Sequence, residues 1–158
     1  MQRNWQKVVV EKLATAVNPA FVIVFGSYAR GSAREDSDLD IAYFANKPLS
    51  GYERFLLAGE IAQACNIDVD LIDMRTVDTV FAAQIFSSGM VIDCQDENAF
   101  VKERMKALSM YLTLNEQRAC EASIDLVIHF VSDLKLGLSK TSREAFKFLE
   151  ENAIIDHA

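Results

Sequence analysis

Two aspartates stand one residue apart in an apolar segment, at Asp38 and Asp40. Successive side chains of a β-strand point to opposite faces, so both carboxylates project from one face of a strand expected over 38–44. Carboxylate oxygens are among the ligands that divalent cations such as Mg²⁺ prefer. The pair therefore predicts a cation site on this strand.

A Gly-Ser turn precedes the aspartates and follows an apolar run, 20–25, that is typical of a central strand covered on both faces. Gly26 permits a sharp turn and close approach of the backbone to a ligand, and Ser27 offers a hydroxyl. A short helix after the turn would present free N–H groups to a phosphate. Arg30 and Arg34 are candidates for further phosphate contacts, although a surface salt bridge for Arg30 and a solvated side chain for Arg34 are equally ordinary interpretations.

A third carboxylate lies on a later apolar segment, 67–74, which is predicted to be a strand. Asp70 would lie beside the first pair if this strand neighbours the one that carries Asp40. It could then ligate a metal and accept the proton of an incoming hydroxyl. Asp68 shares the same face and competes for this role, so spacing leaves the choice open.

The elements that must position these residues form an expected α/β fold, a small mixed sheet with packed helices and a C-terminal helical extension. A short strand is expected over 90–94. Apolar periodicity predicts the following helices: 5–17, 52–65, 76–86, a long pattern from 96 to about 136 as one helix or two, and 141–151. Gly137 is the expected C-cap of the long pattern, and Thr141 with Glu144 forms a capping-box pattern for the last helix.

The composition of the 158-residue chain narrows the classes of function. A net charge of −7 opposes direct binding to nucleic acid. Residues 35–78 include ten acidic residues and only three basic ones. An anionic phosphate would be held there only through a metal. No apolar run approaches the roughly 20 residues that span a bilayer, and the N-terminus lacks a secretory signal, so we expect a cytoplasmic protein with no membrane partner.

The cysteines and histidines offer little for a metal centre. Cys65, Cys94 and Cys120 are widely spaced in apolar patterns and are expected to be buried free thiols. His129 and His157 are the only histidines, which leaves little material for a zinc site. Neither histidine is assigned a catalytic role.

Three motifs carry a resemblance to a known family: GSYARG at 26–31, SDLDIA at 37–42 and DVDLID at 68–73. They resemble the nucleotidyltransferases of the DNA polymerase β type and, more closely, the minimal nucleotidyltransferases of the MntA type, which are antitoxins of bacterial toxin–antitoxin pairs. The resemblance covers roughly residues 5–118. It implies the nucleotidyltransferase fold, with Gly26 and Ser27 at the triphosphate of ATP and two magnesium ions on Asp38, Asp40 and Asp70.

The same resemblance implies the reaction and the partner. Members of the MntA type transfer AMP from ATP to a tyrosine of HepT, an RNA-cleaving toxin, and so silence it. The tail over 120–155 resembles an internal helical piece of HepT itself. The expected organisation is therefore a nucleotidyltransferase domain over 1–118 and a helical extension over 119–158, whose helices are a candidate surface for homo-oligomers.

Two other interpretations of the sequence stay open. The same site could serve a small-molecule acceptor, as in aminoglycoside nucleotidyltransferases, although the chain is short for the helical acceptor domain that those relatives carry. Alternatively, the protein is a non-catalytic module that masks its toxin, or a defunct antitoxin–toxin fusion. Transfer of AMP to a protein is the leading hypothesis. The motifs do not indicate which nucleotide base the site selects.

Overall fold

A four-stranded mixed sheet in the order β3-β2-β1-β4 forms the centre of the protein. The computed structural model describes residues 4–136. The strands are β1 (Phe21–Phe25), β2 (Leu39–Phe44), β3 (Val69–Asp73) and β4 (Met90–Cys94). β1 is antiparallel to both β2 and β4, whereas β2 and β3 run parallel. The expected antiparallel pair around the Gly-Ser turn and the expected mixed sheet are thus confirmed.

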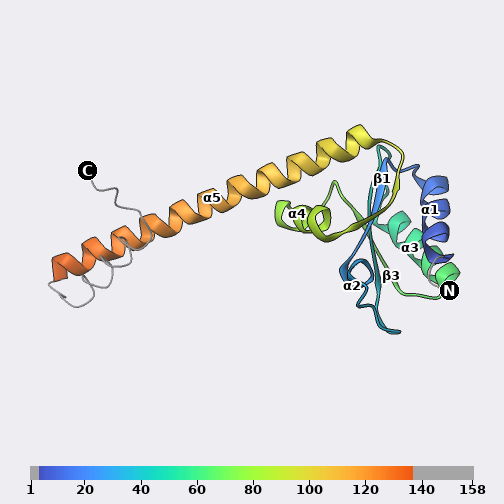
Figure 1. Ribbon diagram of the computed structural model, residues 1–158, viewed down its shortest axis with the longest axis horizontal. Helices are drawn as coiled ribbons and strands as arrows, with labels where there is room; N and C mark the ends of the chain where they lie inside the picture. Colours follow the sequence, from blue (N-terminus) through green and yellow to red (C-terminus); the bar gives the residue numbers. More distant parts are fainter. Residues whose placement is uncertain (1–3, 137–158) are drawn as a thin grey trace. The chain divides into compact units, whose positions relative to one another are not determined.

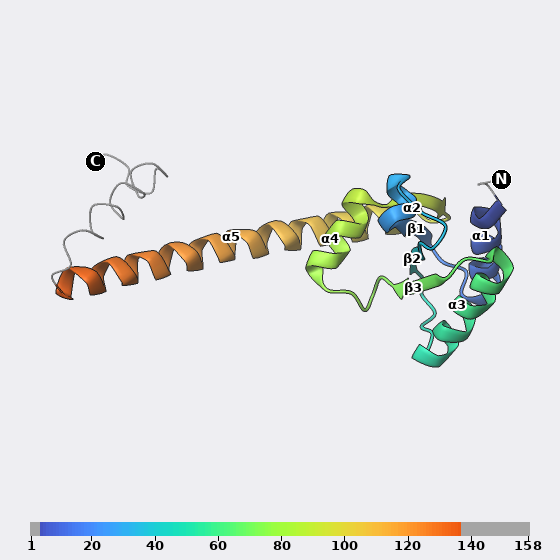
Figure 2. The ribbon, with the colours of Figure 1, turned by 90° about the horizontal axis from the view of Figure 1, so that it is seen from below.

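Helices cover both faces of the sheet. They are α1 (Asn4–Ala16), α2 (Gly26–Arg30), α3 (Gly51–Cys65), α4 (Thr79–Ser88) and α5 (Glu97–Leu136). Figure 1 shows α1 and α3 on one side of the strands and α4 on the other. Figure 2 shows the same division from below, with α2 next to β1. A parallel strand pair needs a crossover connection, and α3 supplies it between β2 and β3.

Strand alternation creates two hydrophobic cores, one on each face. The core under α1 and α3 joins Leu13 and Ile61 to Ile41 of β2, all fully buried. The core under α4 and the start of α5 joins Phe86 to Phe21 of β1. Since β1 is buried along its whole length, it is the central strand that its continuous apolar run predicts.

Side-chain caps fix where the helices begin. Ser50 and Glu53 form a reciprocal capping box at the start of α3, with N···O distances of 3.2 and 2.8 Å. Asp78 accepts a bond of 2.8 Å from the N–H of Phe81 and caps α4. The helix predicted from Thr76 therefore begins three residues later, because Thr76 belongs to a turn in which its hydroxyl bonds the Asp73 carbonyl at 2.9 Å.

The long helical pattern is one unbroken helix as far as it is described. Asp96 caps α5 by accepting a bond of 3.0 Å from the N–H of Ala99, and α5 continues to Leu136. The chain divides into one compact unit that ends at Tyr111 and another that begins at Leu112. The boundary expected at 118 stays a prediction. The expected Gly137 cap, the capping box of the last helix and His157 lie outside the described residues.

Cys65, Cys94 and Cys120 are free thiols, as expected, but the prediction that they are buried is wrong: Cys120 is exposed and the other two are partly exposed. Within residues 4–136, no helix is both long enough and apolar enough to cross a membrane.

Candidate active site

The backbone of Gly26 lies directly against the carboxylate of Asp40. Gly26 has φ +68° and follows Phe25, the residue of β1 that pairs with Asp40 of β2. A Cβ at position 26 would lie 3.2 Å from Cγ of Asp40 and would overlap its Oδ2. Both the positive φ and the absence of a side chain are therefore required, which confirms the close approach expected of this glycine.

Asp40 and Asp70 are paired residues of neighbouring strands. They occupy the same position in the parallel β2–β3 register, so their side chains leave the sheet on the same face. Burial is the main cause that raises the pKa of Asp40, and the negative charges of Asp70 and Asp38 raise it further. Arg30 acts in the opposite direction and lowers it. The site therefore concentrates negative charge that a bound cation would relieve.

The remaining predicted residues surround this pair. Asp38 is exposed and directly precedes β2, which begins one residue later than predicted. Asp68 directly precedes β3, and its carbonyl accepts a bond of 2.7 Å from the N–H of Leu39. The charges that shift the pKa of Asp40 include Asp70 and not Asp68. The register thus brings Asp70, rather than Asp68, opposite Asp40.

Hydrogen bonds fold the loop after α2 back onto the Gly-Ser turn. The Ser27 carbonyl accepts bonds from the N–H and the hydroxyl of Ser32, at 3.0 and 3.5 Å. Tyr28 of α2 packs edge-on against Trp5 of α1, with ring centroids 5.7 Å apart. This contact holds α2 at the end of β1, next to the carboxylates. Arg30 at the end of α2 is exposed, as is Arg34 in the following loop.

The three carboxylates of the site, Asp38, Asp40 and Asp70, meet only part of what a hard divalent cation requires. Asp38, Asp40 and Asp70 offer oxygen ligands alone, as Mg²⁺ prefers, and their mutual repulsion favours a cation. Yet in the described part of the chain, no group of three or more acidic, histidine or cysteine side chains is arranged to hold a metal ion. A magnesium ion here would take its remaining ligands from water and from phosphate oxygens, which is its usual preference.

An ion pair between the buried Asp73 and the exposed Arg75, at the end of β3, was not foreseen from the sequence. Asp73 is 3% exposed, and both of its oxygens accept bonds from the Arg75 guanidinium, at 3.0 and 2.5 Å. Burial raises the pKa of Asp73, but the bonds from Arg75 outweigh it and leave the pKa below its ordinary value. The Asp-x-Arg spacing at the end of an apolar run was the available signal.

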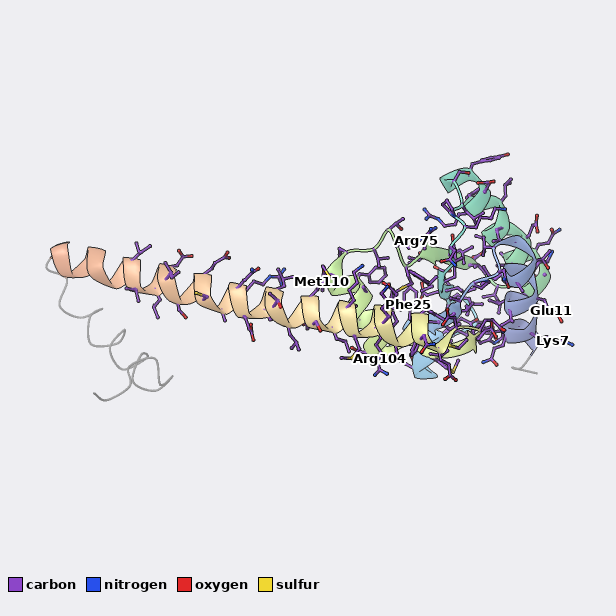
Figure 3. The ribbon with its side chains drawn as sticks, turned by 90° about the horizontal axis from the view of Figure 1, so that it is seen from above. Lys7, Glu11, Phe25, Arg75, Arg104 and Met110 are labelled. Carbon is purple, nitrogen blue, oxygen red and sulfur yellow. The ribbon has the colours of Figure 1, made fainter. Side chains whose placement is uncertain are left out.

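Cavities that the sequence did not predict adjoin the sheet within residues 4–136. One, of about 350 Å³, lies beneath α4 and α5, and Arg75 and Met110, both labelled in Figure 3, line it. Another, of about 370 Å³, lies between α3 and β3 and includes Asp70. The second cavity therefore opens onto the carboxylate site.

Comparison with known proteins agrees with this geometry. The family described as "Polymerase beta, Nucleotidyltransferase" matches residues 7–98. The "Protein adenylyltransferase MntA" of Shewanella oneidensis is 37% identical over 109 residues, which cover 68% of this chain and 75% of that protein.

Solved structures of toxin–antitoxin complexes contain similar chains. One, a toxin–antitoxin with AMP-PNP, has a chain with TM-score 0.68 and 31% identity, covering 78% of this chain and 98% of that one. Another contains the tri-AMPylated Shewanella oneidensis HEPN toxin with the MNT antitoxin; its matching chain has TM-score 0.65 and 29% identity, covering 81% of this chain and 99% of that one.

Proposed function

The chain belongs to the nucleotidyltransferase family of the polymerase β type, and on this basis we propose that it transfers AMP from ATP to a tyrosine hydroxyl of a HepT-like toxin. It would act as an antitoxin, with magnesium as cofactor. The observation that carries the proposal is the pairing of Asp40 with Asp70 beside the Gly26 turn. The names of its relatives, a protein adenylyltransferase and an antitoxin bound to an AMPylated toxin, support the protein acceptor.

Each site residue has a role in this reaction. Gly26, Ser27 and Arg30 would bind the β- and γ-phosphates, which leave as pyrophosphate. Magnesium ions on Asp38, Asp40 and Asp70 would neutralise the triphosphate and the charge that develops at the attacked phosphorus.

Asp70 is placed to serve the acceptor as well. It would accept the proton of the tyrosine hydroxyl as the oxygen bonds to the α-phosphorus and the bond from that phosphorus to pyrophosphate breaks. Asp70 is exposed at the edge of the sheet, whereas Asp40 is partly buried between β1 and β3. An acceptor can thus reach Asp70 from a side that the Gly26 turn does not occupy.

Mass spectrometry of a HepT protein from the same organism, incubated with this protein, ATP and Mg²⁺, tests the proposal. We expect AMP on a tyrosine of HepT, and none when Asp38→Asn and Asp40→Asn are combined. A HepT protein that binds but gains no AMP would refute the protein acceptor, and screening of small-molecule hydroxyls would follow.

The double variant also tests the non-catalytic alternative. If it still neutralises the toxin in growing cells while AMP transfer is absent, masking by binding explains the antitoxin effect. If neutralisation is lost together with transfer, the enzymatic interpretation holds. Gel filtration with HepT shows whether the double variant keeps its binding.

A further inference from the structure

The free edge of β3 has backbone groups without a partner strand. β3 is the outer strand of the sheet, and β2 is its only neighbour among residues 4–136. Two backbone bonds, from the Leu39 N–H to the Asp68 carbonyl and from the Met74 N–H to the Tyr43 carbonyl, set the direction of the peptide groups. They show that the backbone N–H and C=O groups of the even-numbered residues along β3 point toward β2. Alternate peptide groups of a strand point in opposite directions, so the N–H and C=O groups of Val69 and Leu71 point outward.

A groove of about 370 Å³ runs along this edge between β3 and α3. One wall is the strand from Val69 to Ile72, and the other is formed by Arg54, Phe55 and Ala58 of α3. Phe55 is 74% exposed although it is a large apolar side chain. Asp70 lines the same groove, so the groove leads directly to the proposed reaction centre.

Arg54 gives the groove a cation without an acidic partner. It is half-buried, and its charge lowers the pKa of Asp73. However, Arg75 already occupies both oxygens of Asp73. Within residues 4–136, the salt bridges do not include Arg54. A carboxylate that enters the groove would therefore meet an unpaired guanidinium.

We propose that this groove binds an extended segment of the acceptor protein as an added strand on β3. The proposal rests on the proposed function and names how its acceptor is held. Backbone bonds to Val69 and Leu71 would align the segment, and its tyrosine would lie opposite Asp70. An acidic side chain of the segment would pair with Arg54, and Phe55 would cover the segment.

The geometry also restricts the acceptor sequence. Asp70 projects from the face of the sheet that α4 covers, whereas Arg54 comes from α3 on the opposite face. Side chains of an added strand alternate between these faces. The residue numbers of the tyrosine and of the acidic residue in the acceptor should therefore differ by an odd number, such as one or three.

Kinetics with variants of α3 residues test the groove. Phe55→Ala and Arg54→Gln should each raise the KM for the HepT acceptor by about tenfold or more while the KM for ATP stays unchanged. Arg54→Lys keeps the charge and should have a smaller effect. Tyr52→Ala is the matched control, because Tyr52 is equally exposed, at 71%, but does not line the groove. Equal acceptor KM values in Phe55→Ala, Arg54→Gln and Tyr52→Ala would overturn the proposal.

Hydrogen exchange tests the added strand without requiring catalysis. Binding of HepT should slow exchange of the Leu71 amide in the Asp38→Asn, Asp40→Asn double variant, which cannot turn over. Unchanged exchange at Leu71 in the bound complex would overturn the proposal even if AMP transfer occurs. If the unaltered protein transfers no AMP but HepT binding still slows exchange of the Leu71 amide, only the proposed function is refuted. Protection that appears without HepT and rises with protein concentration would assign the edge to a second copy of this chain and also overturn the proposal.

Discussion

The backbone of Gly26 and the carboxylate of Asp40 touch, so the turn after β1 and the strand β2 form one unit. Gly26 has a positive φ, and a Cβ there would overlap Oδ2 of Asp40. A larger residue at position 26 would displace the carboxylate that the proposed magnesium site needs.

Gly26→Ala should therefore reduce AMP transfer by at least about tenfold and destabilise the fold by about 1 kcal/mol or more through its positive φ. Gly31→Ala is the matched control, because Gly31 has φ +69° but a Cβ added there would meet no atom within 4 Å. It should share the loss of stability and keep the activity. Turnover rates and thermal unfolding of both variants distinguish the two effects, and equal activities would show that the Gly26–Asp40 contact has no catalytic importance.

Asp70→Asn should lower turnover by about a hundredfold or more, since it removes a carboxylate that we propose as both metal ligand and proton acceptor. Asp68→Asn should change turnover by less than about threefold, because Asp68 lies before β3 and is not the residue that pairs with Asp40. Single-turnover kinetics at saturating ATP compare the two. A larger loss in Asp68→Asn would reverse the assignment of the third carboxylate.

Asp40→Asn should make the metal-free protein more stable at neutral pH. The pKa of Asp40 is raised in the folded state, chiefly by burial, so ionisation costs stability above that pKa and costs nothing below the ordinary value of 3.8. The gain from the substitution should accordingly vanish in acid. Thermal unfolding in EDTA between pH 3 and pH 8 measures it, and a loss of stability at neutral pH would contradict the expected repulsion among the carboxylates.

Asp73→Asn should destabilise the protein by about 2 kcal/mol, because it removes the charge-assisted hydrogen bonds between Asp73 and the Arg75 guanidinium. The pKa of Asp73 is lowered in the folded state, so its contribution is fully present above the ordinary value of 3.8 and is lost as pH falls through the lower folded value. Urea unfolding at neutral and acidic pH checks both statements. Asp36→Asn, on an exposed loop, is the control and should change little.

The order and type of the elements follow from local patterns. A continuous apolar run predicts the buried strand β1, and alternation around Asp40 predicts β2, because side-chain direction depends only on neighbouring residues. The ends of the elements were predicted less accurately. For example, α4 begins at Thr79 rather than Thr76, because Asp78 caps the helix. The α/β fold and the free state of the thiols were predicted correctly, whereas the sequence left open whether α5 is one helix or two and wrongly predicted that the thiols are buried.

By itself, the sequence determined the chemistry of the site: a glycine for a tight turn, a serine, and carboxylates at alternate positions of strands. Only the tertiary structure decided that Asp70 rather than Asp68 lies opposite Asp40 and that Gly26 touches Asp40. It also decided that Arg54, beside the edge of β3, forms no salt bridge within residues 4–136. The physical reason is that each of these relationships joins residues from different elements. Their register and distance are set by strand order and by packing across the sheet, which no local pattern records.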